Sequence, residues 1–142
     1  MNICVAIPII AGVFLAGCTQ QHATRAELIK KEIAALKSYC TGNARTAEAA
    51  LLDSERYSRC CQLAGVNGIL FDEVFARTYG RLYLVEKHLG KSGAAEEYFQ
   101  KAAEHYQRSF AARGRSITGP HAMQLLIEKE LDAGLKVAWK AE

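Results

Sequence analysis

The sequence predicts an all-α fold of about five antiparallel helices arranged as helical hairpins, and two observations carry this prediction. Apolar residues recur at steps of three and four across most of residues 24–140, the spacing that places side chains on one face of a helix. Segments rich in Gly, Ser, Thr and Asn divide the pattern into five stretches, and none of these alternates as a strand does. Since connections of about 2–6 residues join antiparallel neighbours, we expect hairpins.

The first helix is expected over residues 24–41, where Thr24 and Glu27 have the spacing of a capping box. Gly42 suits the left-handed position after a helix end, and Asn43 suits the cap of the next helix. The apolar stripe expected to face the core consists of Leu28, Ile29, Ile33, Leu36 and Cys40.

The second and third helices are expected over residues 44–64 and 69–89. Asp72 and Glu73 fall in the first turn of the third helix, where negative charge is favourable. The stripes of these two helices contain Ala47, Ala50, Leu51, Ser54, Tyr57, Cys61 and Ala64, and Leu70, Val74, Tyr79, Leu82, Val85 and Leu89.

The fourth helix is expected over residues 93–113, with Ser92 as its cap and with Glu96 and Glu97 in its first turn. The fifth is expected over residues 120–140 and begins at a proline, which suits a first helical turn because its missing N–H has no helical partner there.

Length and charge restrict the class of protein. A chain of 142 residues is one domain, or one domain with a tail. With 50% hydrophobic and 23% charged residues, the composition is that of a globular protein and excludes wholesale disorder. The net charge of +3 is small and the basic residues do not cluster, so we expect no nucleic-acid partner.

The N-terminus differs from the rest of the chain, because no Lys, Arg, Asp or Glu precedes Arg25. Residues 3–17 are apolar, yet a helix of that length falls short of the hydrocarbon core of a bilayer, which is about 30 Å thick. The length suits the apolar region of a secretory signal peptide. This stretch ends Leu15-Ala16-Gly17 and is followed by Cys18.

These four residues resemble the lipobox of bacterial lipoproteins, in which Leu, a small residue, and Gly or Ala precede a cysteine. The resemblance implies cleavage before Cys18, a diacylglycerol thioether on its sulfur and acylation of the new N-terminus. Residues 1–17 would then be a cleaved signal peptide, residues 18–23 a lipidated tether and residues 24–142 the helical domain.

The same resemblance bears on location. Residue 19 is Thr, and in Gram-negative lipoproteins the absence of Asp at this position favours the periplasmic face of the outer membrane. Met1-Asn2 departs from the usual pattern because it carries no Lys or Arg. The alternatives are an ordinary signal peptide and an apolar helix packed in a cytosolic core.

Residues 79–102 resemble a tetratricopeptide repeat. Tyr79-Gly80-x-x-Tyr83 is similar to the Leu-Gly-x-x-Tyr element of the first helix of such a repeat, and Ala95-x₃-Phe99-x₂-Ala102 matches the element of the second helix. The two elements are further apart than in the usual repeat, and the helix pairs recur at 45–51 residues instead of about 34. The fold is therefore expected to be either a short tetratricopeptide-like array or a compact bundle.

Three cysteines lie in the expected helical domain. Cys40 ends the first helix, whereas Cys60 and Cys61 end the second, so an antiparallel hairpin separates them by roughly 25 Å. A disulfide needs Cα atoms within about 7 Å. We expect buried thiols at Cys40 and Cys61, and an exposed thiol at Cys60 that could pair between molecules.

No histidine has the spacing of a zinc site, and the sequence contains no nucleophile or phosphate-binding motif. His105 is expected at the surface. We therefore expect no metal, no cofactor and no enzymatic activity. An enzyme or small-ligand binder built from scattered residues is the least favoured alternative.

Tyrosines and arginines concentrate on the third and fourth expected helices, and both residue types are enriched where proteins bind partners. They either fill the core or line a partner groove, for which the candidates are Arg77, Tyr79, Arg81, Tyr83, Tyr98 and Tyr106. The function expected first is a membrane-anchored envelope lipoprotein that binds a protein or peptide. The alternative is a self-associating structural or stress-linked lipoprotein without a groove.

Overall fold

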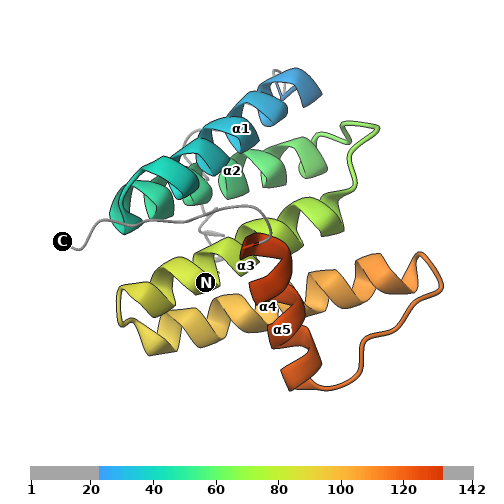
Figure 1. Cartoon of the computed structure of the whole chain (residues 1–142). Coiled ribbons are helices and arrows are strands. Elements are labelled where there is room, and N and C mark those ends of the chain that lie inside the picture. The colour runs from blue at the N-terminus through green and yellow to red at the C-terminus, as the bar shows by residue number, and fades with distance from the viewer. Residues whose placement is uncertain (1–22, 133–142) are drawn as a thin grey trace, which may run out of the picture.

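The computed structural model describes residues 23–132, with side chains through residue 129, and contains five helices in this part of the chain (Figure 1). The all-α prediction is confirmed, since no strand occurs between residues 23 and 132. The helices are α1 (Arg25–Thr41), α2 (Ala44–Leu63), α3 (Phe71–His88), α4 (Ser92–Ala111) and α5 (Pro120–Asp132).

Helix boundaries agree with the expected ones to within two residues wherever both lie in the described part. The lipobox residues Leu15, Ala16, Gly17 and Cys18, and the end of the fifth expected helix, lie outside the described residues.

The helices pack in chain order. α1 packs on α2, α2 on α3 and α3 on α4, and Figure 1 shows α5 crossing the α3–α4 hairpin. The middle helix α3 therefore has neighbours on several sides, and it is the most deeply buried helix of the five.

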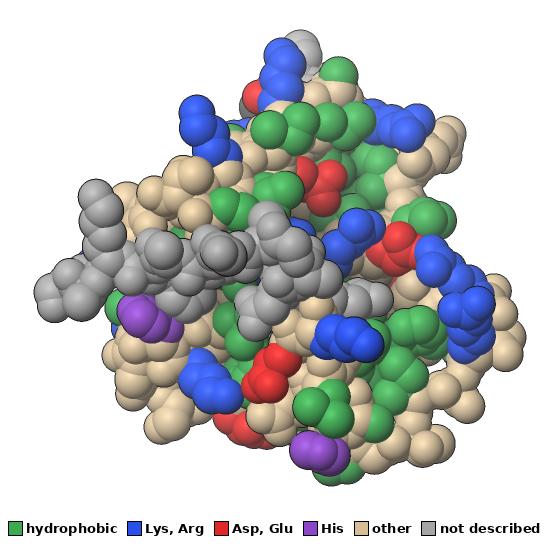
Figure 2. Space-filling view, viewed as in Figure 1, with side chains coloured by type: hydrophobic (Ala, Val, Ile, Leu, Met, Phe, Trp, Pro, Cys, Tyr) green, Lys and Arg blue, Asp and Glu red, His purple; other side chains and the backbone are tan. Residues whose placement is uncertain are grey.

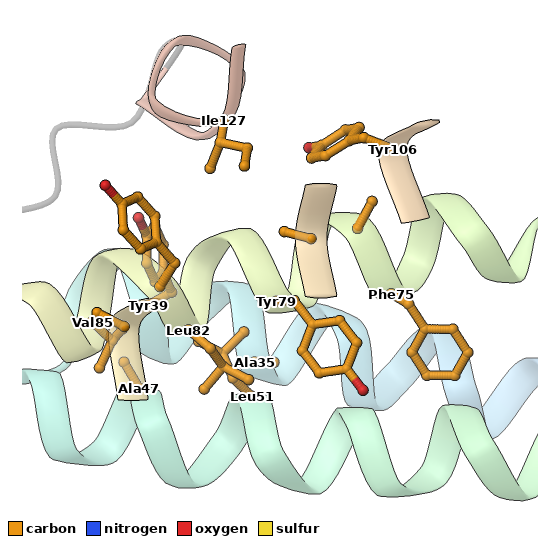
Figure 3. Close-up of a cluster of buried hydrophobic side chains, with 14 of the residues drawn as sticks. Ala35, Tyr39, Ala47, Leu51, Phe75, Tyr79, Leu82, Val85, Tyr106 and Ile127 are labelled. Carbon is orange, nitrogen blue, oxygen red and sulfur yellow. The ribbon is translucent and has the colours of Figure 1, made fainter. Parts of the chain in front are cut away.

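The core is built around α3 (Figure 3). Leu82 and Val85 lie over Ala47 and Leu51 of α2, and Ile127 of α5 covers the opposite side of α3. Small residues allow close helix contact at the third and fourth helices, since Gly80, Ala95 and Ala102 are all buried.

The expected core stripes are wrong at several positions: Ala64 and Leu70, at the ends of the second and third stripes, are exposed, and the stripe of α1 differs most from the expectation. In α1 the buried residues are Leu28, Ala35 and Tyr39, whereas Ile29 is 43% and Ile33 is 61% exposed. Apolar residues occupy a wider arc of α1 than α2 and α3 can cover, and the large Tyr39 ring takes the covered position. Ile29 and Ile33 are left on an open face.

The helix caps are partly as expected. Thr24 accepts a hydrogen bond from the Glu27 N–H at 3.2 Å, but its own N–H donates to the hydroxyl of Tyr57 at 3.1 Å instead of to Glu27. Asn43 and Thr46 form the complete reciprocal box at the start of α2. Tyr57 thus ties the first turn of α1 to α2.

Two other end signals act differently from the prediction. Gly42 has φ −86°, so it is not left-handed; a Cβ there would lie 2.5 Å from the carbonyl oxygen of Ser38, so glycine is required for space. Ser92 is the first residue of α4 and not its cap. This start places Glu96 and Glu97 beyond the first turn.

Candidate functional site

The expected groove residues divide into buried and accessible groups. Tyr79, Tyr83 and Tyr106 are only 2%, 8% and 5% exposed, while Tyr98 is half-buried and Arg77 is exposed. The three buried rings fill the space between helices, as Figure 3 shows for Tyr79 and Tyr106. They present little surface to a partner.

Tyr79 is held by a polar cluster. Its hydroxyl donates to Glu55 at 2.6 Å and accepts from Arg59 at 2.5 Å, so α3 is fastened to α2. Burial, followed by the bond to the Glu55 carboxylate, raises the pKa of Tyr79 far above its usual range. The Lys101 ammonium of α4 lies 5.7 Å from the centre of the ring. This cluster stabilises the fold.

His105 is not a surface residue. Its side chain is 17% exposed, its Nδ1 lies 2.8 Å from Asp72 Oδ1, and its ring centre is 5.0 Å from that of Phe75. Burial lowers the pKa of His105. Burial also opposes ionisation of Asp72, but hydrogen bonds from His105 and Arg108 outweigh it and lower the Asp72 pKa. Asp72 therefore joins α3 to α4.

Two carboxylates, the buried Glu86 and the half-buried Glu48, lie where α2 meets the α3–α4 connection. The Glu86 side chain is 2% exposed, and the Lys91 Nζ lies 3.3 Å from Glu86 Oε2 and 3.0 Å from Glu48 Oε1. Burial and then the hydrogen bond with Glu48 raise the pKa of Glu86. Sequence reasoning missed this group, although Glu86 directly follows the core residue Val85.

The cysteines also depart from expectation in one respect. Cys61 is a free, buried thiol and Cys40 a free, half-buried one. Burial raises the pKa of Cys61. Cys60 is only 9% exposed, which corrects the expectation of an exposed thiol. The end of α2 lies close enough to the first turn of α1 that Cys61 Sγ is 3.8 Å from the Thr24 carbonyl oxygen.

Arg81 has a buried side-chain nitrogen that forms no hydrogen bond. It lies half-buried on α3, with its guanidinium carbon 5.9 Å from the centre of the Tyr39 ring of α1. Its Nε is buried and has no hydrogen-bond partner, and no carboxylate of the described residues pairs with it. Burial lowers the pKa of Arg81. A desolvated guanidinium whose buried Nε has no hydrogen-bond acceptor is unfavourable, so this position favours an incoming anion.

Arg77 lies one turn before Arg81 and lines two open pockets. A pocket of about 210 Å³ lies between α1 and α3, where Ile29 and Glu32 face Glu73 and Arg77. A pocket of about 230 Å³ lies on the α4 side of the same arginine. We call the surface formed by Ile29, Glu32, Glu73, Arg77 and Arg81 the α1–α3 face.

The α1–α3 face combines an apolar wall with paired charges. Arg77 donates to the Glu73 carboxylate at 3.3 Å. Burial raises the pKa of Glu32, against the opposing effect of Arg77 and Arg81. Figure 2 shows apolar side chains over α1, with acidic and basic side chains between α1 and the α3–α4 hairpin.

Comparison of this chain with protein-family models, curated proteins and solved structures gives no match. Among the helices described, none has the length and apolarity needed to cross a membrane. Residues 23–129 contain no group of three or more His, Cys, Asp or Glu side chains suited to holding a metal ion.

Proposed function

We propose that this chain is a bacterial envelope lipoprotein, anchored through a lipid on Cys18, whose helical domain binds a carboxylate-bearing segment of a protein partner along the α1–α3 face. The observation that carries the binding proposal is the buried Nε of Arg81, which has no hydrogen-bond partner among the described residues. A guanidinium offers a planar fork of N–H donors that matches a carboxylate. The partner therefore supplies the hydrogen-bond acceptor that the Nε of Arg81 lacks.

The other members of the face support a peptide partner over a small anion. Ile29 is 43% exposed and lies beside Glu32 at the wall of the α1–α3 pocket. An extended segment could place a carboxylate at Arg81 and an apolar side chain against Ile29. Arg77, already paired with Glu73, would add positive charge at the edge of the site.

The anchor part of the proposal rests on the tetrapeptide Leu15-Ala16-Gly17-Cys18, and Thr19 favours the outer membrane in a Gram-negative cell. Mass spectrometry of the chain purified from bacterial membranes tests it. We expect a mature N-terminus at Cys18 carrying diacylglycerol and an amide-linked acyl chain. A chain that keeps residues 1–17, or that begins elsewhere without lipid, would contradict the anchor.

The binding part is tested by affinity capture from native membranes with the intact lipoprotein, using Cys18→Ser as the control for membrane-dependent capture. The decisive comparison is Arg81→Met against Arg56→Met, since Arg56 is an exposed arginine on α2 away from the face. We expect the captured partner to be lost with Arg81→Met and kept with Arg56→Met. Equal capture by both variants would refute the role of Arg81.

A second candidate function is self-association, and the exposed Ile33 favours it. Ile33 is 61% exposed on the open face of α1, next to Ile29 in helical order. If this face joins two copies, sedimentation of the mature protein should depend on concentration, and Ile33→Ser should abolish that dependence. A monomer at all concentrations would leave partner binding as the better proposal.

A further inference from the structure

The connection between α2 and α3 is unusually apolar for an exposed segment. No Asp, Glu, Lys or Arg occurs from Cys60 to Phe71. Within this stretch Leu63 is 63% and Leu70 is 66% exposed, the two highest exposures among the large apolar side chains of the described residues. We call residues 63–70 the leucine loop.

The leucine loop has a defined conformation. Gly65 and Gly68 adopt φ values of 68° and 75°, which glycine reaches without strain. The Val66 N–H donates to the Cys61 carbonyl at 3.0 Å, closing the end of α2. Leu63, the last residue of α2, and Leu70, the residue before α3, are therefore exposed on either side of a defined turn.

The loop lies at the end of the bundle where the chain enters α1. Cys61 at the end of α2 contacts the Thr24 carbonyl, and a Cβ on Gly68 would lie 3.2 Å from Nη1 of Arg25. Figure 1 shows the start of α1, the α2–α3 connection and the α4–α5 connection at one end of the molecule. At about 3.5 Å per residue, the tether from Cys18 to Thr24 spans at most about 25 Å.

The rim of this end carries basic groups. Arg25 and Arg115 form no ion pair with the described residues, and Arg113 pairs with Glu73. The nearby acidic side chains are engaged by other groups, Asp72 by His105 and Arg108 and Glu27 by Lys30. A pocket of about 370 Å³ beside Leu70 is lined by apolar residues, by Arg113 and by the ion-paired carboxylates Asp72 and Glu73. Apolar side chains with arginines nearby, and with the neighbouring carboxylates already in ion pairs, match a bilayer surface with anionic headgroups.

We propose that the leucine loop is a second membrane contact, in which Leu63 and Leu70 insert among the lipid acyl chains while Arg25 and Arg115 bind the phosphates of anionic lipids. This inference rests on the proposed lipid anchor, which brings the loop within reach of the bilayer. It sets the bundle end-on to the membrane. The α1–α3 pocket, which Arg25 and Leu70 also line, then lies next to the bilayer, and the face continues away from it through Arg77 to Arg81.

Fluorescence quenching by lipids brominated on their acyl chains tests the proposal. The full chain, purified from bacterial membranes, is placed in vesicles of phosphatidylethanolamine and phosphatidylglycerol. One variant carries Asn67→Trp in the leucine loop, and its matched control carries Gly93→Trp at the opposite end of the bundle, where a side chain has open space. The unsubstituted chain corrects for Trp139.

We expect brominated lipid to quench the tryptophan at position 67 and to leave the one at position 93 unquenched. Leu63→Ser with Leu70→Ser should abolish this quenching, whereas Leu125→Ser, on another exposed leucine, should preserve it. Arg25→Gln with Arg115→Gln should make the quenching at position 67 independent of the phosphatidylglycerol content of the vesicles. Equal quenching at the two positions would overturn the proposal, as would self-association that the loop substitutions abolish.

Mass spectrometry of the same sample tests lipidation of Cys18 independently of the membrane contact of the leucine loop. An acylated Cys18 without quenching at position 67 keeps the anchor and refutes the loop contact. Quenching at position 67 in a chain without lipid refutes the anchor and supports the loop contact.

Discussion

The hydroxyl of Tyr79 on α3 donates a hydrogen bond to the carboxylate of Glu55 on α2 at 2.6 Å. This bond crosses the interface between the first and second hairpins, and the Arg59 guanidinium closes the cluster by donating to the same hydroxyl. The tyrosine matches one position of a repeat-like sequence element, yet its hydroxyl serves to hold the two hairpins together.

Removing that hydroxyl should destabilise the domain. We expect Tyr79→Phe to lower the free energy of unfolding by about 1–3 kcal/mol, because a half-buried carboxylate loses a donor. Denaturant unfolding followed by circular dichroism measures the change. Tyr98→Phe is the matched control: Tyr98 is half-buried on α4, and we expect its loss of a hydroxyl to change stability by less than about 0.5 kcal/mol. Equal effects of the two substitutions would contradict a specific role for the Tyr79–Glu55 bond.

The buried His105 predicts how stability depends on pH. Its pKa is lowered in the folded state, chiefly by burial, so the unfolded chain binds a proton more readily. The resulting stability is present above the unfolded pKa of about 6.5 and is lost as the pH falls through the lower folded value. We expect His105→Gln to flatten this part of the pH profile.

Thermal unfolding between pH 7.5 and pH 5 measures that effect. His121→Gln is the control, because His121 is exposed at the start of α5. The steeper loss of stability on acidification should remain in the control variant. If His105→Gln unfolds with the same pH dependence as the unsubstituted protein, protonation of His105 is not the cause of the loss of stability at low pH.

The two kinds of apolar residue on α1 should respond differently to truncation. Leu28 is 1% exposed and Ile33 is 61% exposed. We expect Leu28→Ala to cost about 2–5 kcal/mol of stability, because it leaves a cavity. Ile33→Ala should change stability by less than about 0.5 kcal/mol. Denaturant unfolding compares the two variants, and a larger loss from Ile33→Ala would mean that the open face of α1 is covered in solution.

Helical periodicity predicted the positions of the elements well, because the apolar steps and the intervening turn residues agree. Periodicity predicted the buried residues of α1 less accurately. The pattern at Ile29 and Ile33 shows only that a helix is apolar over a wide arc, and the position of α2 and α3 against that arc depends on contacts far apart in the chain.

The polar clusters were harder to predict for the same reason. Asp72 lies in the first turn of α3 as expected, but its bond to His105, which lies 33 positions along the chain, was not foreseen. Glu86 is buried among core residues, and its partner Glu48 comes from another helix. Residue spacing along one helix contains no information about such pairs. The arginines Arg77 and Arg81 remain candidates for partner binding, and only the packing around Arg81 shows that its Nε is buried without a hydrogen-bond partner.

Gly42 has a consequence for recognising relatives of this protein. Its backbone is one that any residue could adopt, yet a Cβ would lie 2.5 Å from both the Ser38 carbonyl oxygen and the Thr46 hydroxyl oxygen. Chains that diverged from a common ancestor while keeping this tight turn should therefore retain glycine at the equivalent position, even where the core residues have been exchanged. A glycine followed by an Asn-x-x-Thr cap is a short signature by which remote relatives could be recognised.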